Sequence, residues 1–178
     1  MKIKTNIGEP LSVDLENRTI VHWITTVAVD ADGESVIPEG IQLDRFLNNP
    51  VVFKDHKYSL EDQIGRCLNL DVRAGIGIIA TTQFKKAVPD ILWEAYSTGF
   101  TKGWSVGYTE PVKEGIKVVR CQLLEYSAVA LPNNPETLTF LRSKGFIAPK
   151  KSRIIVPKKT IIGALNKPRC NCKKGNKL

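Results

Sequence analysis

A serine, a histidine and a glutamate in three separate segments supply the residue types of a serine-hydrolase triad. Ser105 lies in the segment Gly-Trp-Ser-Val-Gly-Tyr, and His56 follows the apolar residues 51–53. Glu125 interrupts the apolar stretch 123–131. A serine hydroxyl becomes a nucleophile when a nearby base takes its proton, and a third group can orient that base. Unrelated folds place the three groups in different chain orders, so the order His, Ser, Glu excludes no arrangement.

The segment around Ser105 predicts a strand with one bulky and one bare face. Side chains alternate across a strand, which sets Trp104, Val106 and Tyr108 against Ser105, Gly107 and Thr109. A peptide backbone can therefore approach Ser105 without meeting a large neighbour. The alternative is a serine that only fills a tight contact within a sheet.

The chain has two histidines, which narrows the search for the base. His56 lies in a polar segment just past an apolar strand, where an imidazole with a pKa of ~6.5 can accept and return a proton. His22 is embedded among Val21, Trp23 and Ile24, which favours a packed strand residue. We interpret His56 as the base, with an ordinary surface histidine as the alternative.

Glu125 is the candidate for the group that orients the imidazole. A carboxylate within an apolar stretch is buried only if it is paired. The alternatives are an exposed strand glutamate or a structural ion pair with Arg120. Asp55 is a weaker candidate for the same role, because neighbouring residues on a strand face opposite ways.

The patterns of apolar residues and turn formers predict the elements that must position these groups. We expect strands, listed by residue number, at 18–30, 51–53, 64–72, 76–84, 103–110 and 116–131, the last one broken or bulged. Helices are expected at 41–47, from Pro89 to Gly99, and at 135–145. Six or seven strands with three helices and no strict alternation predict a mainly antiparallel α+β fold. A β-barrel is the expected way to cover strands that are apolar on both faces.

Charge divides the chain into two regions. Residues 1–145 carry 16 basic and 18 acidic groups, whereas ten Lys or Arg and no acid lie in 146–178. A length of 178 residues suits one domain with an appendage. We therefore predict a domain at 1–146 and a basic, flexible tail at 147–178.

Other classes of protein are disfavoured by composition. The chain has no apolar run near the ~20 residues that a membrane span needs, and its first residues lack the apolar segment of a secretory signal. An intracellular protein without membrane contact is therefore expected. Its four cysteines form no disulfide framework, and the pair Cys170 and Cys172 lacks the second ligand pair of a zinc site. We expect no metal and no organic cofactor.

Several short motifs occur together in one order. They are Pro-x-Gly at 38–40, Leu-x-x-Phe and Asn-Pro-Val within 43–51, Ile-Gly-Arg at 64–66, Gly-x-Ser-x-Gly-aromatic at 103–108, and Glu-x-Ser-x-Val-x-x-Pro-x-Asn-Pro at 125–135. In this order and spacing, residues 17–146 resemble the prohead, or capsid-maturation, serine proteases of tailed bacteriophages. That family is related to the herpesvirus assemblins.

The resemblance implies an assemblin-like fold and a serine endopeptidase activity. Ser105 matches the nucleophile and His56 the base, and Glu125 is the third member. The assemblins use a second histidine in that role, so His22 is the alternative. A Gly-x-Ser-x-Gly string also occurs in α/β-hydrolases, but these need a histidine after the serine, and neither histidine follows Ser105.

The resemblance also implies the substrates and the location. The substrates would be the scaffold or a scaffold-like segment of the major capsid protein, with the protease itself as a further one. Self-association is a further expectation. The protein would act in the bacterial host cytoplasm, inside the assembling procapsid.

Two other classes of function stay open. One is a non-catalytic capsid-assembly or scaffolding factor with the same barrel. The other is a nucleic-acid-binding barrel that uses the basic tail, although no aromatic residue lies between 147 and 178 to stack on bases. The tail itself is expected to contact acidic scaffold or to be removed by self-cleavage.

Overall fold

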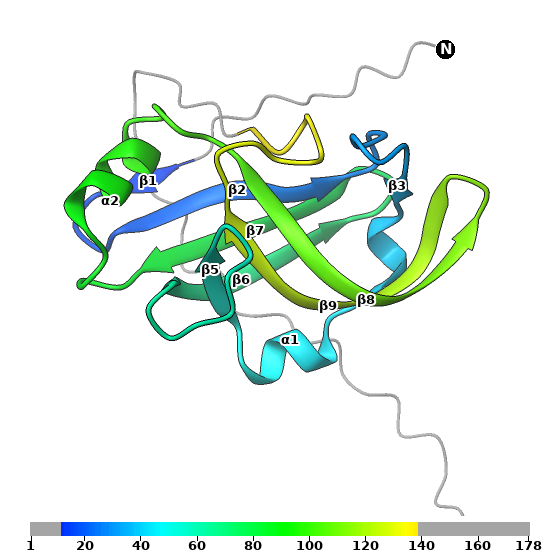
Figure 1. Cartoon of the computed structure of the whole chain (residues 1–178), viewed down its shortest axis with the longest axis horizontal. Coiled ribbons are helices and arrows are strands. Elements are labelled where there is room, and N and C mark those ends of the chain that lie inside the picture. Colours follow the sequence, from blue (N-terminus) through cyan, green and yellow to red (C-terminus); the bar gives the residue numbers. More distant parts are fainter. Residues whose placement is uncertain (1–11, 139–178) are drawn as a thin grey trace, which may run out of the picture.

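The computed structural model describes residues 12–138 of the chain, which form a strand-rich α+β fold (Figure 1). Within this range a single sheet of nine strands is accompanied by two α-helices, α1 (Asp44–Asn48) and α2 (Asp90–Ser97), and by the 3-10 turn η1 (Pro38–Gly40). The strands in chain order are β1 (Val13–Asp14), β2 (Thr19–Thr26), β3 (Ser35–Val36), β4 (Ile41–Gln42), β5 (Val51–Lys54), β6 (Gln63–Arg73), β7 (Gly77–Phe84), β8 (Trp104–Glu114) and β9 (Lys117–Ala128).

The long strands pair antiparallel, and the short ones pair parallel with β9. The sheet runs β1, β2, β7, β6, β5 and β9, with β3 and β4 beside β5 along the same edge of β9. β8 pairs antiparallel with the other edge of β9 over nearly its whole length. β9 is therefore central, because it joins β5 to β8.

The expected barrel is wrong, because the sheet is not closed. β8 lies across β2 in Figure 1, but within residues 12–138 its backbone pairs only with β9. Side chains join the two strands instead: the rings of His22 and Trp104 stack at a centroid distance of 3.5 Å. We call this line between β2 and β8 the open seam.

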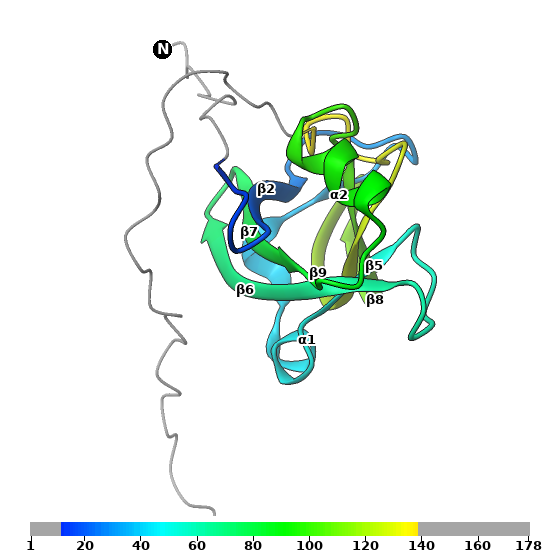
Figure 2. The same ribbon diagram turned by 90° about the vertical axis from the view of Figure 1, so that its left-hand side faces the viewer.

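Curvature explains how an open sheet covers strands on both faces. The pairing register shifts in β2–β7, β5–β6, β6–β7 and β8–β9. Such bulges bend a strand and increase its twist. The sheet therefore curves around its own core, as the turned view in Figure 2 shows.

The core fills the inside of this curved sheet. Its largest fully buried side chains include Trp104, Tyr126, Phe46 and Phe84, each no more than 2% exposed. Tyr96 of α2 anchors the start of β8, because its hydroxyl contacts the carbonyls of Gly103 and Val129, each over 3.0 Å.

Several predicted elements are confirmed. The hairpin of β6 and β7, the strand β5 and the helix α2 after Pro89 lie where the pattern indicated. Residues 41–47 contain β4 before the helix α1, so only the second half is helical. The predicted helix at 135–145 and the tail at 147–178 fall mostly or entirely outside the described residues. Residues 135–136, which are described, form a turn.

No helix in residues 12–138 is long and apolar enough to cross a membrane.

Candidate catalytic site

The pairing of β8 with β9 brings the predicted nucleophile and the predicted acid to one face of the sheet. Ser105 lies opposite Ser127, and Gly107 lies opposite Glu125. Residues that are directly opposite share a face, and so do residues two positions apart. Ser105 and Glu125 are therefore neighbours across the ladder, although 20 residues separate them in sequence.

A tight turn at the end of β5 brings His56 over the same face. Asp55 and His56 both have left-handed backbones, with φ of 51° and 55°. The N–H of Asp55 donates to the carbonyl of Ala128 over 3.0 Å, and the N–H of His56 donates to the hydroxyl of Ser127 over 3.1 Å. Left-handed non-glycine residues are costly and occur often at functional sites.

His56 and Glu125 form a close pair. Nδ1 of His56 lies 2.7 Å from Oε1 of Glu125, whose side chain is only 3% exposed. The other carboxylate oxygen, Oε2, accepts the hydroxyl of Ser127 over 2.6 Å. A buried carboxylate is costly unless it is paired, and here both oxygens have partners.

The hydrogen bond that Nδ1 of His56 donates to Glu125 raises the pKa of His56 above its usual 6.5. The negative charges of Glu125 and Asp55 act in the same direction, whereas partial burial of the imidazole opposes them. In the neutral imidazole, a proton on Nδ1 directed at Glu125 leaves Nε2 as the acceptor. The pair thus has the form of a base held by an acid.

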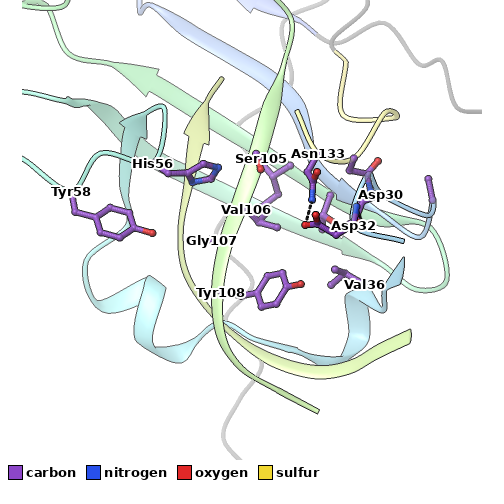
Figure 3. A pocket seen from close by; sticks show the side chains of 14 residues that line it. Asp30, Asp32, Val36, His56, Tyr58, Ser105, Val106, Gly107, Tyr108 and Asn133 are labelled. Atoms are coloured by element: carbon purple, nitrogen blue, oxygen red, sulfur yellow. Dashed lines mark hydrogen bonds between the residues drawn. The ribbon is translucent and has the colours of Figure 1, made fainter. Parts of the chain in front are cut away.

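Ser105 and His56 line the same pocket, which has a volume of about 320 Å³. The pocket lies at the open seam, since its walls come from β2, β8 and the segments beside them; they include Ile24, Thr25, Ala28, Asp30, Asp32, Val36, Tyr58, Val106, Tyr108 and Asn133. Figure 3 shows the imidazole directed from its turn toward the part of β8 that carries Ser105. The absence of closure between β2 and β8 therefore leaves room for a ligand at Ser105.

Ser105 is partly exposed and, among the described residues, forms no hydrogen bond to His56. Hydrogen bonds between a nucleophile and its base are often long before substrate binds. The hydroxyl and the imidazole share one pocket, and rotation about χ1 of Ser105 changes their separation.

His22, the alternative third member, lies in the core and not at the pocket. It is fully buried, stacks on Trp104, and its Nε2 lies 2.7 Å from Oγ1 of Thr82. Burial lowers the pKa of His22 to about 3, so it is neutral at ordinary pH. The structure brings Glu125, and not His22, to the imidazole of His56.

The sequence did not indicate what two further residues of the site do. Ser127 contacts both Glu125 and the turn of His56, and Gly107 leaves space for the Glu125 carboxylate. The alternation of β9 could have indicated Ser127, since it lies two positions from Glu125. The need for a glycine at 107 depends on the pairing register, which the sequence does not display.

Beside this candidate site, the described residues form no metal site and contain no reactive thiol. Within 12–138 no group of three or more His, Cys, Asp or Glu side chains is arranged to hold a metal. Cys67 and Cys121 are buried free thiols, and burial raises the pKa of each to about 11. A thiol with such a pKa is a poor nucleophile at neutral pH.

Comparison of the chain with protein-family models, with curated protein sequences and with solved structures gave no match.

Proposed function

We propose that this chain is a serine endopeptidase in which Ser105 is the nucleophile, His56 the general base and Glu125 the group that orients His56. The observation that carries this proposal is the 2.7 Å contact between His56 and the buried Glu125, beside a pocket that also contains Ser105. An orienting carboxylate on one imidazole nitrogen and a partly exposed serine in the same pocket are the groups that proton transfer from the serine requires.

The reaction follows from this arrangement. Nε2 of His56 takes the proton of Ser105 while Oγ forms a bond to the peptide carbonyl carbon. The imidazolium, stabilised by Glu125, then gives that proton to the leaving nitrogen as the C–N bond breaks. Water attacks the acyl-enzyme in the same way, with His56 again as the base, and releases the carboxylic acid.

The edge of β8 supports a peptide as the substrate class. In the described part of the chain β8 pairs with β9 alone. At its other edge the Thr137 hydroxyl donates to the carbonyl of Trp104, and from Ser105 onward this edge has no strand partner. An extended peptide can add to such an edge through main-chain hydrogen bonds. The side chain of Ser105 itself is small and partly exposed in the pocket beside this edge.

The capsid-maturation role is supported by the motifs at 38–40, 43–51, 64–66, 103–108 and 125–135. We accordingly propose the scaffold, or a scaffold segment of the major capsid protein, as substrate, with the protease itself as a further one. The reaction would take place in the procapsid within the bacterial host cytoplasm. The proposed relation to the assemblins concerns the strand arrangement and the site, not a closed barrel.

A fluorophosphonate probe, which reacts with activated serines, tests the enzyme proposal. Wild type and Ser97→Ala are expected to become labelled; Ser97 is a control because it is a partly exposed serine of α2 whose hydroxyl donates to the carbonyl of Glu94 in the same helix. Ser105→Ala and His56→Ala are expected to remain unlabelled while keeping the wild-type fold by circular dichroism. Undiminished labelling of Ser105→Ala would exclude Ser105 as the nucleophile.

Coexpression with a capsid protein from the same genome tests the substrate. Cleavage is expected with wild type and not with Ser105→Ala. A non-catalytic assembly factor, the competing function, predicts normal assembly with both proteins and cleavage with neither.

A further inference from the structure

A buried serine connects the two halves of the candidate site. Ser127 lies on β9, two residues after Glu125, and is 0% exposed. Its hydroxyl donates to Oε2 of Glu125 over 2.6 Å and accepts the backbone N–H of His56 over 3.1 Å. One oxygen atom therefore contacts both the acid and the turn that carries the imidazole.

The chemistry of the partners fixes the direction of both hydrogen bonds. A carboxylate oxygen can only accept and a backbone N–H can only donate, whereas a hydroxyl has one hydrogen and two lone pairs. The hydrogen of Ser127 is thus committed to Glu125, and a lone pair to His56. Alanine at this position would leave a buried carboxylate oxygen and a backbone N–H without these partners.

The turn needs this contact because the β5–β9 ladder ends just before it. The last aligned pair is Lys54 with Ala128, and the N–H of Asp55 still reaches the carbonyl of Ala128. His56, the second left-handed residue, donates its N–H to the Ser127 side chain instead. The hydroxyl therefore extends the ladder by one bond across a costly backbone conformation.

We propose that Ser127 is a positioning residue that holds the Glu125 carboxylate and the His56 turn in fixed relation, so that the imidazole stays directed toward Ser105. The inference rests on the proposed function, because it assigns Ser127 to the reaction of Ser105. Ser127 acts through His56 and Glu125.

Ser35 provides a matched control for Ser127, because it is a buried serine whose hydroxyl bonds only to a backbone carbonyl. It is 7% exposed, and its hydroxyl donates to the carbonyl of Val27 over 2.8 Å. Its neighbour Val36 lines the pocket, so the Ser35 side chain points to the opposite face of β3. Ser35→Ala removes a buried hydroxyl of the same kind without touching Glu125 or His56.

The first readout is the pKa of His56, measured by NMR titration of the untagged full chain. Ser105→Ala serves as the background, so that no reaction occurs. Because the chain has two histidines and the pKa of His22 is about 3, the titration of His56 can be followed separately from that of His22. Glu125 on β9, Asp55 in the turn and the hydroxyl of Tyr58 are the titratable groups near it. In the Ser105→Ala background, we expect a second substitution, Ser127→Ala, to lower the pKa of His56 toward 6.5. The second substitution Ser35→Ala should leave the pKa of His56 unchanged.

The second readout is the rate of fluorophosphonate labelling in proteins with Ser105 intact. Ser127→Ala is expected to slow labelling about tenfold or more, since a positioned base contributes about 100-fold or more. Ser127→Thr, which keeps the hydroxyl, is expected to restore most of the rate. If Ser127→Ala does not fold, Ser127→Cys keeps a weak donor of similar size and should give an intermediate pKa for His56.

The positioning role is overturned if Ser127→Ala matches Ser35→Ala in both the pKa of His56 and the labelling rate. One further outcome would separate the positioning role of Ser127 from the proposed hydrolase function. If wild type is not labelled but the pKa of His56 depends on Ser127, the hydrolase proposal fails while the positioning of His56 by Ser127 is upheld.

Discussion

The carboxylate of Glu125 occupies the space that a side chain at Gly107 would need. A Cβ at position 107 would collide with Oε1 of Glu125 and would lie 3.2 Å from the hydroxyl of Tyr58. The same Oε1 is the atom that contacts Nδ1 of His56. The glycine opposite Glu125 on the ladder is therefore a condition for the His56–Glu125 pair.

Gly107→Ala is expected to displace Glu125 and to abolish most fluorophosphonate labelling, because the carboxylate must move away from Nδ1. Gly65→Ala is the control: a Cβ there would collide with the carbonyl of Gln83, which is part of the sheet and not of the site. We expect both variants to lower the melting temperature. Only Gly107→Ala should slow labelling of the folded protein, and equal labelling rates would contradict the role of this glycine.

The rate of fluorophosphonate labelling is expected to rise with pH and to reach a plateau above the pKa of His56, which is higher than 6.5. His56 must be neutral to accept the proton of Ser105, and its hydrogen bond to Glu125 raises its pKa. Glu125→Gln removes the negative charge, so the midpoint of the profile should move down toward 6.5 while the plateau rate falls by about 100-fold or more. Rates measured from pH 5 to 9 check this, and an unshifted midpoint would contradict the pairing.

The same pair predicts how stability depends on pH. A histidine whose folded pKa is raised stabilises the fold fully below the unfolded pKa of ~6.5, and this contribution is lost as pH rises through the folded pKa. The melting temperature of wild type should exceed that of His56→Asn by more at pH 5.5 than at pH 9. Thermal melts of both proteins at the two pH values measure the change, and a difference that grows with pH would have the wrong sign.

His22→Ala is expected to destabilise the fold without removing the base. Its ring is fully buried against Trp104 and in contact with Thr82, so truncation leaves a cavity and removes one of the two partners of the Thr82 hydroxyl, at a cost of about 2–4 kcal/mol. Denaturant unfolding measures this loss. Labelling of the folded protein should stay within about threefold of wild type, whereas labelling as low as in His56→Ala would make His22 part of the site.

Removal of residues 147–178 is expected to leave the probe-labelling rate and the melting temperature close to those of the full chain. Ser105, His56 and Glu125 all lie in the described fold, between β5 and β9. The deletion removes ten positive charges, so binding to an acidic scaffold should weaken and become less sensitive to salt. A loss of probe labelling would instead connect the tail with the site.

The sequence by itself determined most of the local elements and the residue types of the site. Alternation in residues 103–109 indicates which side of β8 is bare, and the polar segment after residues 51–53 indicates an accessible His56. The apolar stretch around Glu125 indicates a carboxylate that is buried only if it is paired. These conclusions depend on side-chain periodicity and on the cost of burying charge, both of which act within a few residues.

Only the tertiary structure decided how these residues meet. The register that pairs Gly107 with Glu125, the left-handed turn at His56 and the burial of His22 beneath Trp104 depend on contacts between segments far apart in the chain. The open seam is a further example, since apolar residues on both faces of a strand demand cover but do not say whether a ladder or packed side chains supply it. Strand periodicity specifies a face, whereas a shift of one residue in pairing changes which side chains share it.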